Sequence, residues 1–198
     1  IGLHNLCYPI INKKSLITYG RQVAGKNSHF SESQIFLKYY PEKNKFSDIS
    51  FFCNNANAAI DKEVWQNLLF DEEITGLEDM ELAKRLSLDG KNINYIKDAT
   101  VFHHHHENWV QIMRRFEREA IALQKIMPQL HFNLFDFIYF YISSVLLDLH
   151  AAYKKNVLLC NAIDILRYRW FQYFGVYKGS HLHRILSKKE KDVYFYPN

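Results

Sequence analysis

Hydrophobic positions recur every three or four residues in the second half of the chain, which is the spacing of one face of an α-helix. The longest such run follows Asn108, a residue type that favours helix N-caps, and stops at Pro128, which cannot continue a helix. Another run follows Asn133, with Asp136 three residues further on as in a capping box. The helices predicted from these patterns are residues 109–127, a helix that starts at 134, and residues 156–175.

In the first half, short apolar segments alternate with polar ones, as in a chain of mixed strands and helices. Asp61 stands where the N-cap of a short helix is expected, and Gly90 fits the C′ position after a helix over residues 77–89. Strands are predicted at residues 16–22, 49–53, 93–96 and 100–103, with a turn at 97–98 and a long loop at 23–48 that holds one helical turn near 32–39.

This order predicts an α/β layer followed by a C-terminal α-helical appendage. The composition changes near Pro128, so we expect one domain over residues 1–127 and a helical region over residues 128–198. The chain begins at Ile1 without an initiator Met or a leader, which indicates a piece of a longer protein.

The composition is that of a globular protein, with 48% hydrophobic and 23% charged residues among 198. Cys7, Cys53 and Cys160 are far apart and form no ligand motif, which favours a reducing, cytoplasmic compartment. The formal net charge of +4 is unevenly distributed, with an acidic stretch at residues 61–81 and a basic one at 154–191. Nucleic-acid binding is not expected, because no reader motif accompanies the basic stretch.

A membrane-spanning helix is not predicted. The most apolar stretch is 132–149, but its uncharged run, 137–147, is shorter than the ~20 residues that a span requires. A core helix or one that lies at a membrane interface remains open.

Two adjacent carboxylates, Glu78 and Asp79, open the helix that follows Gly76. The helix dipole and free backbone N–H groups would keep the Asp79 carboxylate ionised and able to accept a proton. The alternative is structural, since acidic residues are generally favoured in first turns.

Four consecutive histidines, 103–106, follow a predicted strand. Because side chains alternate on a strand, only His103 with His105, or His104 with His106, share a face, and one pair is a candidate for a divalent-metal site. The alternative is a polar strand end.

Basic side chains follow the histidines. Arg114 and Arg115 are suited to a diphosphate, although Arg115 with Glu119 is also a typical surface ion pair. Aromatic residues at 168–177 interleave with Arg and Lys, which indicates core packing or a basic aromatic face on anionic lipid.

Taken together and in order, several of these segments resemble the acceptor half of a family 2 glycosyltransferase, most closely the rhamnosyltransferase-like members that build bacterial surface polysaccharide. The segments are residues 19–22, 52–60 followed by 63–65, 70–72, 77–86 and 101–105, with the tail from 168 to 179. The resemblance therefore covers most of the chain.

The resemblance implies a GT-A (Rossmann-like) fold, a nucleotide-sugar donor, a glycan or lipid-linked glycan acceptor and a divalent metal, Mg²⁺ or Mn²⁺. It also implies inversion at the anomeric carbon. A cytoplasmic location is expected, with the basic aromatic tail as a candidate contact with the inner face of the cell membrane. Asp79 would be the general base, and Glu78 would position the acceptor.

The remaining assignments that the resemblance implies concern binding. Asn55 and Asn57 would border the acceptor site, and Arg21 with Gln22 would mark the strand that enters it. His103 or His105 would meet the metal or the donor diphosphate, with Arg114 and Arg115 as the basic residues that follow.

Family members begin with a nucleotide-binding half that ends in an Asp-x-Asp-type motif, and no such half precedes residue 16 here. We therefore expect negligible transferase activity from this piece by itself. The alternative hypothesis is a non-enzymatic module that docks on a membrane through its basic aromatic tail. A histidine-centred metallohydrolase is disfavoured, because no H-E-x-x-H motif is present.

Overall fold

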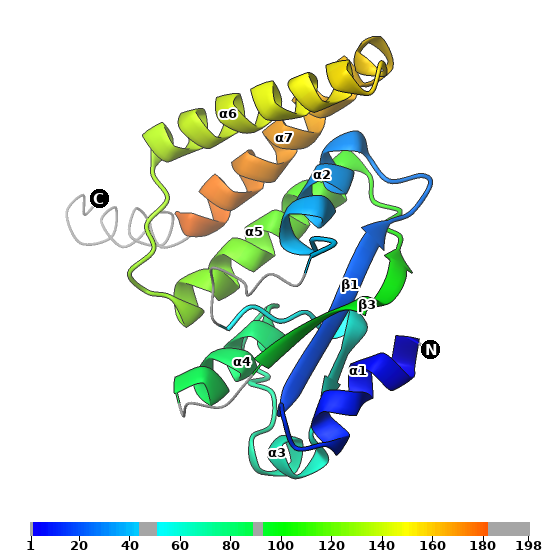
Figure 1. Ribbon diagram of the computed structural model, residues 1–198. Coiled ribbons are helices and arrows are strands. Elements are labelled where there is room, and N and C mark those ends of the chain that lie inside the picture. The colour runs from blue at the N-terminus through cyan, green and yellow to red at the C-terminus, as the bar shows by residue number, and fades with distance from the viewer. Residues whose placement is uncertain (1, 44–50, 89–92, 182–198) are drawn as a thin grey trace, which may run out of the picture. The chain divides into compact units, whose positions relative to one another are not determined.

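The computed structural model describes residues 2–43, 51–88 and 93–181 (Figure 1). The chain divides into two compact units between His106 and Glu107. The first unit combines helices with a sheet and the second is helical, which confirms the α/β class expected from the sequence. The composition change at Pro128 falls inside the second unit, after its first helix.

The first unit holds a three-stranded mixed sheet in the order β2-β1-β3, in which β1 is antiparallel to β2 and parallel to β3. Its elements are α1 (Gly2–Ile11), β1 (Ile17–Ala24), α2 (Phe30–Tyr39), the 3₁₀ turn η1 (Asn55–Asn57), β2 (Ala58–Ile60), α3 (Lys62–Asn67), α4 (Glu78–Leu88) and β3 (Ile93–His103).

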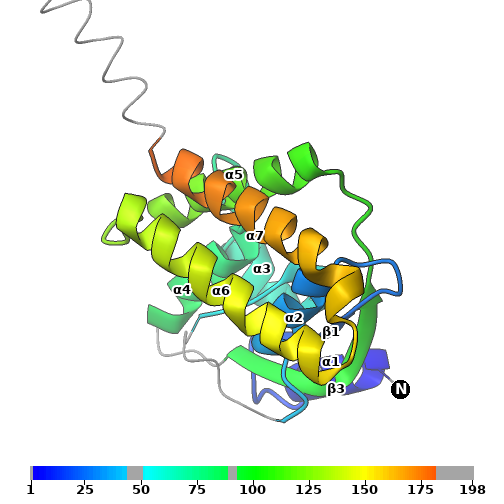
Figure 2. The same ribbon diagram turned by 90° about the horizontal axis from the view of Figure 1, so that it is seen from above.

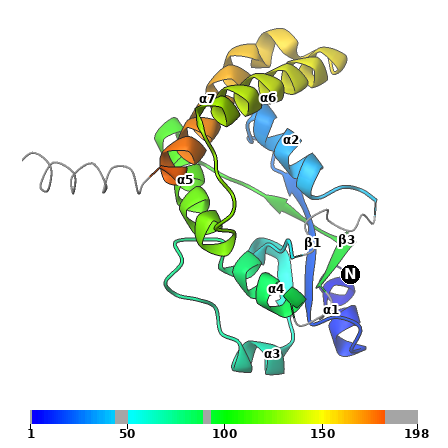
Figure 3. The same cartoon turned by 90° about the vertical axis from the view of Figure 1, so that its left-hand side faces the viewer.

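Different helices cover the two faces of this sheet. Ile17 and Tyr19 of β1 belong to a buried cluster with residues of α2 and α4. Thr18 points the other way, because side chains alternate along a strand, and its hydroxyl donates to the Leu6 carbonyl of α1 at 2.7 Å. Figure 3 shows α1 and α4 on opposite sides of β1. The central strand is therefore enclosed on both faces.

β3 is a single strand where the sequence predicts two strands and a turn at residues 97–98. Gly20 of β1 pairs with Ile96, but Gln22 pairs with Val101, so β3 carries extra residues between these two pairs. Such an irregularity is a bulge, which lets the ladder resume after a local bend.

The side chain of Asn57 stabilises this bulge. Its amide donates to the Ala99 carbonyl at 2.7 Å and to the Arg21 carbonyl at 3.3 Å. A Cβ at Gly20 would collide with the Asn57 amide and with the Ala99 carbonyl, so this approach requires glycine. Asn57 thus joins the two parallel strands.

Two further predictions for the first unit are wrong. α2 is a ten-residue helix rather than one turn, because Phe36 and Tyr40 both pack in the core. Phe51 and Cys53 are not in a strand, and β2 forms instead at Ala58–Ile60, where the chain pairs with β1. Residues 49–50 of the predicted strand and Gly90 lie outside the described residues.

The N-caps that the sequence predicts are confirmed. The Asp61 side chain accepts from the backbone N–H groups of Glu63 and Val64 at the start of α3. Asn108 with Gln111 and Asn133 with Asp136 form capping boxes for the next two long helices.

The second unit consists of α5 (Trp109–Ile126), α6 (Leu134–Lys154) and α7 (Leu158–Ser180). Gly175 and Gly179 bring α7 against α5, since a Cβ at either would collide with the Met113 or Glu117 carbonyl. α6 and α7 lie side by side as a helical hairpin (Figure 2). Residues 182–198, and with them the end of the basic stretch, lie outside the described residues.

Among the described residues, one helix, α6, is long and apolar enough to cross a membrane by length and composition. The sequence predicts no membrane-spanning helix, because the uncharged run 137–147 is too short. α6 extends beyond that run on both sides, and its 21 residues reach the length that a span requires.

Candidate functional site

Asp79 lies in the first turn of α4, two residues after a strained one. Leu77 has a φ of 58°, in the left-handed region that non-glycine residues rarely adopt. Such strain persists only where the surrounding structure enforces it, and it clusters at functional sites. The turn that presents Glu78 and Asp79 is therefore held in an unfavourable backbone conformation.

The Asp79 carboxylate is enclosed, with the residue only 7% exposed. One oxygen accepts from the Asn55 backbone N–H at 2.6 Å, and the other from the Met80 N–H at 2.7 Å. The sequence-based hypothesis places this residue facing a bound acceptor. In this structure the segment around Asn55 folds over the carboxylate and leaves little of it open to solvent, so an acceptor hydroxyl would have to displace the Asn55 N–H to reach it.

Burial raises the pKa of Asp79, and the neighbouring Glu78 carboxylate raises it further, whereas the N–H groups of Asn55 and Met80 lower it. Burial prevails, so the pKa lies above its ordinary value. The loss of solvation therefore outweighs the helix terminus and the two N–H groups in setting this pKa. A raised pKa also makes the carboxylate a stronger base.

A chain of amides connects Asp79 to the centre of the sheet. Gln22 of β1 is 2% exposed, and its Nε2 donates to the Asn54 side-chain oxygen at 2.8 Å. The same Asn54 oxygen accepts from the Ala56 N–H and caps η1. Asn55, the next residue, donates to Asp79. Gln22 therefore holds the turn that holds the carboxylate.

The other predicted residues near Asp79 have definable contacts. Glu78 accepts from the Asn55 amide at 3.5 Å. Arg21 of β1 forms an ion pair with Glu42 at 2.7 Å. Asn57, predicted to border an acceptor, donates to backbone carbonyls of the bulge instead, and this contact has a structural role.

The histidine tract alternates as the sequence predicts. Nε2 of His103 and Nε2 of His105 are 2.8 Å apart, while the rings of His104 and His106 stack with centroids 6.3 Å apart. His103 ends β3 beside Ala24, the last residue of the parallel strand β1. The His103–His105 pair therefore stands at the carboxyl end of the sheet, where open α/β sheets bind ligands.

Glu32 of α2 completes this pair, and sequence reasoning did not identify it. Its carboxylate, which is buried, lies 2.6 Å from Nδ1 of His105. If Nδ1 of His105 donates to this carboxylate, Nε2 of neutral His105 is an acceptor, and Nε2 of His103 donates to it. The contact spans 73 positions of sequence between a polar loop and a strand end, so no local pattern indicates it.

Two aromatic residues of the α2 region, Phe36 and Tyr40, lie between the Asp79 carboxylate and the imidazoles of His103 and His105. The ring of Phe36 contacts those of His103 and His105, with centroids 5.6 and 6.2 Å apart. Tyr40 contacts Phe36, and burial together with the nearby Asp79 charge raises its pKa. Asp79 and the histidines thus flank one aromatic pair on the same unit.

Several polar atoms near the end of β1 are buried without a hydrogen-bond partner among the described residues. They are Arg21 Nε, Ser28 Oγ, Ser31 Oγ and Gln34 Nε2. Buried polar groups are nearly always satisfied in native proteins, so each of these atoms is expected to hydrogen-bond to water or to a bound polar group.

Arg114 and Arg115 belong to α5 in the second unit. Arg114 is exposed. Arg115 forms an ion pair with Glu107 at 2.8 Å, donates to the Tyr168 hydroxyl at 3.4 Å and stacks over the Phe116 ring. Arg115 therefore stabilises its own helical unit through Glu107, and the Glu119 carboxylate, which the sequence suggested as its partner, also favours its charge.

The chain was compared with protein-family models, curated proteins and solved structures. No protein-family model, no curated protein and no solved structure matches the chain.

Proposed function

We propose that the chain is the acceptor-side part of a GT-A, family 2-like glycosyltransferase that moves a sugar from a nucleotide-sugar donor to a glycan or lipid-linked glycan. The observation that carries the proposal is the Asp79 carboxylate. It is buried, has a raised pKa, follows a strained residue and is fixed by two backbone N–H groups. A charged group kept in such surroundings costs stability, which is typical of a catalytic carboxylate.

In this proposal Asp79 is the general base. It takes the proton from the acceptor hydroxyl as that oxygen attacks the anomeric carbon of the donor. The new glycosidic bond forms on one face while the bond to the nucleoside diphosphate breaks on the other, so the configuration inverts. The proton remains on the Asp79 carboxyl, whose raised pKa suits it to hold that proton.

Asn55 and Glu78 would orient the acceptor. Both lie directly at Asp79, and Asn55 contacts each of the two carboxylates. Gln22 acts through Asn54 and is a positioning residue rather than a contact residue. Arg21, whose buried Nε lacks a partner among the described residues, would donate to an oxygen of the substrate.

His103 and His105 would meet the donor diphosphate or its metal ion, and the donor set suits Mn²⁺ better than Mg²⁺, because imidazole is a poor Mg²⁺ ligand. When bound, a divalent ion neutralises the charge that develops on the leaving diphosphate. The Nε2 atoms of His103 and His105, which lie 2.8 Å apart, are the atoms that would hold such an ion. Glu32 would hold His105 in the required tautomer.

The proposal is tested by Asp79→Asn in the protein that contains these residues. We expect transfer from UDP-, dTDP- or GDP-sugars to lipid-linked acceptors, measured as release of nucleoside diphosphate, to fall by about 10²–10⁴-fold. Donor binding by calorimetry should stay within about twofold, because the base does not contact the donor in the ground state.

Asp98→Asn is the matched control, since Asp98 is exposed on β3. It should leave turnover unchanged. Circular dichroism melts of both variants separate lost folding from lost chemistry. Full turnover by a folded Asp79→Asn protein would reject the base, and failure of every donor to bind would reject the transferase.

A further inference from the structure

Polar side chains on the inner face of the α6–α7 hairpin pair with one another. Asp148 of α6 and Arg169 of α7 are both buried and form a bidentate ion pair. Arg169 Nε donates to Asp148 Oδ2 at 2.8 Å, and Arg169 Nη2 donates to Asp148 Oδ1 at 3.0 Å. The Ser144 and Tyr173 hydroxyls share a hydrogen bond of 2.6 Å. The hairpin is therefore a defined structural element whose outward face needs a separate explanation.

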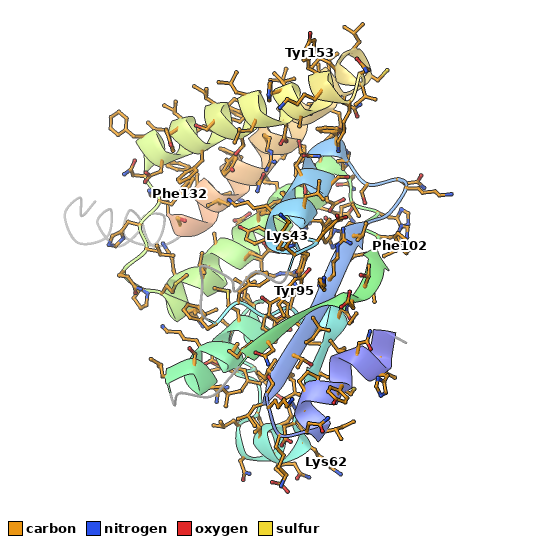
Figure 4. The ribbon with its side chains drawn as sticks, viewed as in Figure 1. Lys43, Lys62, Tyr95, Phe102, Phe132 and Tyr153 are labelled. Carbon is orange, nitrogen blue, oxygen red and sulfur yellow. The ribbon has the colours of Figure 1, made fainter. Side chains whose placement is uncertain are left out.

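The outward face of α6 is apolar over most of its length, with the exposed His150 near its C-terminal end. Only 11% of its most apolar 18-residue window is buried, so α6 is not the core helix of this unit. Phe135 is 82% exposed and Leu147 is 69% exposed. The exposed large apolar residues of α6 are Leu134, Phe135, Ile138, Tyr139, Phe140, Ile142, Leu146, Leu147 and Tyr153. In Figure 4, Phe132 and Tyr153 lie at opposite ends of this helix.

The outward side of α7 continues the apolar surface as a single stripe. Its exposed large apolar residues are Leu159, Ile163, Leu166, Trp170 and Phe174. Their spacing of four, three, four and four residues places them on one side of the helix. Both helices of the hairpin therefore expose apolar residues, and exposed patches of this extent mark interaction sites.

Exposed cations accompany this surface. Lys154 and Lys155 are exposed at the hairpin turn, and Arg167 is exposed beside the α7 stripe. The hairpin also carries three acidic residues, none of them fully exposed: Asp136 caps α6, Asp148 pairs with Arg169, and Asp164, like Lys155, has a further interaction. The surface is thus apolar and cationic.

We propose that this face of the hairpin lies in the plane of an anionic lipid bilayer. The apolar side chains of α6 and α7 enter the headgroup and acyl boundary, while Lys154, Lys155 and Arg167 contact lipid phosphates. The docking surface is independent of the proposed transferase chemistry.

An in-plane position also fits the buried ion pair better than a transmembrane one. A spanning hairpin would carry Asp148 and Arg169 into the hydrocarbon and would place Asp164 and Arg167 of α7 there too, at a cost of several kcal/mol. On the surface, Arg167 reaches the headgroups and the ion pair stays within the hairpin.

The test is flotation of the purified protein with vesicles of phosphatidylcholine alone or with phosphatidylglycerol. We expect flotation with the anionic vesicles and its loss as salt rises toward 0.5 M. Leu147→Ser with Ile163→Ser should reduce the bound fraction more than tenfold. Lys154→Gln with Lys155→Gln should remove the preference for anionic lipid. Leu37→Ser, an exposed apolar residue of α2, is the matched control and should change nothing.

Depth is measured through Cys160, which is exposed next to Leu159, in a Cys7→Ser background that removes the partly exposed cysteine. A polarity-sensitive fluorophore on Cys160 should shift to the blue on anionic vesicles and be quenched by shallow rather than deep lipid quenchers. Absence of flotation, flotation that the hairpin variants leave intact, deep quenching, or a soluble dimer that the variants dissociate would each overturn the proposal. None of these outcomes depends on enzyme activity.

Discussion

The two units differ from the usual distribution of polar and apolar side chains in opposite ways, one in its interior and the other on its surface. The first unit buries Gln22, Glu32 and Asp79 in its interior, whereas the second neutralises its buried charges as the pair Asp148 and Arg169 and exposes apolar side chains outside. A buried polar group and a large exposed apolar patch are the two informative exceptions to burial rules. This contrast is the basis on which we propose chemistry for the first unit and surface attachment for the second.

The largest effect that the comparison predicts is on stability in the second unit. Asp148→Ala leaves Arg169 buried without its partner, so we expect the free energy of unfolding to fall by about 3–5 kcal/mol in urea titrations. The double variant Asp148→Leu, Arg169→Met removes both charges and should be close to wild type or more stable. Equal losses in the single and double variants would show that the pair does not compensate its own burial.

The next effect concerns the buried carboxylate of the first unit. Glu32→Gln replaces the charged acceptor of His105 Nδ1–H by a neutral amide oxygen, which holds the ring less firmly and makes it a weaker ligand, and we expect Mn²⁺ affinity to fall about 10–100-fold in calorimetry. Glu63→Gln changes an exposed carboxylate of α3 and should leave the affinity unchanged. If both variants bind Mn²⁺ as the wild type does, Glu32 does not orient a metal ligand.

The smallest effect separates the two faces of α6. Leu147→Ser changes an exposed residue and should alter the free energy of unfolding by no more than about 0.5 kcal/mol. Val145→Ala changes a buried neighbour and should cost roughly 2 kcal/mol. Thermal melts of the two variants compare them directly, and a large loss for Leu147→Ser would mean that its face is packed in the folded protein.

Local signals predicted the helical elements well. The caps at Asp61, Asn108 and Asn133 depend on residues within three positions, and all form as expected. β2 and the full length of α2 depend on pairing with β1 and on core contacts, which no short pattern contains. Propensity therefore placed a strand at residues 49–53 instead of Ala58–Ile60.

The candidate site shows the same division between local and distant contacts. Alternation along a strand predicted that His103 and His105 share a face, and the helix start located Glu78 and Asp79. The contact of Glu32 with His105 and the cover over Asp79 arise from segments far apart in the chain. Burial of Asp79, which raises its pKa, is a tertiary property and was not predicted.

The most direct test of the central claim is the pH dependence of kcat/KM for sugar transfer. A general base must be deprotonated, so the wild-type rate should rise tenfold per pH unit below its pKa and level off above it. Burial raises the pKa of Asp79, so this limb should lie above the ordinary aspartate value of about 3.9. Asp79→Asn should be slow and lack the limb; an unchanged limb and rate in that variant would contradict the account.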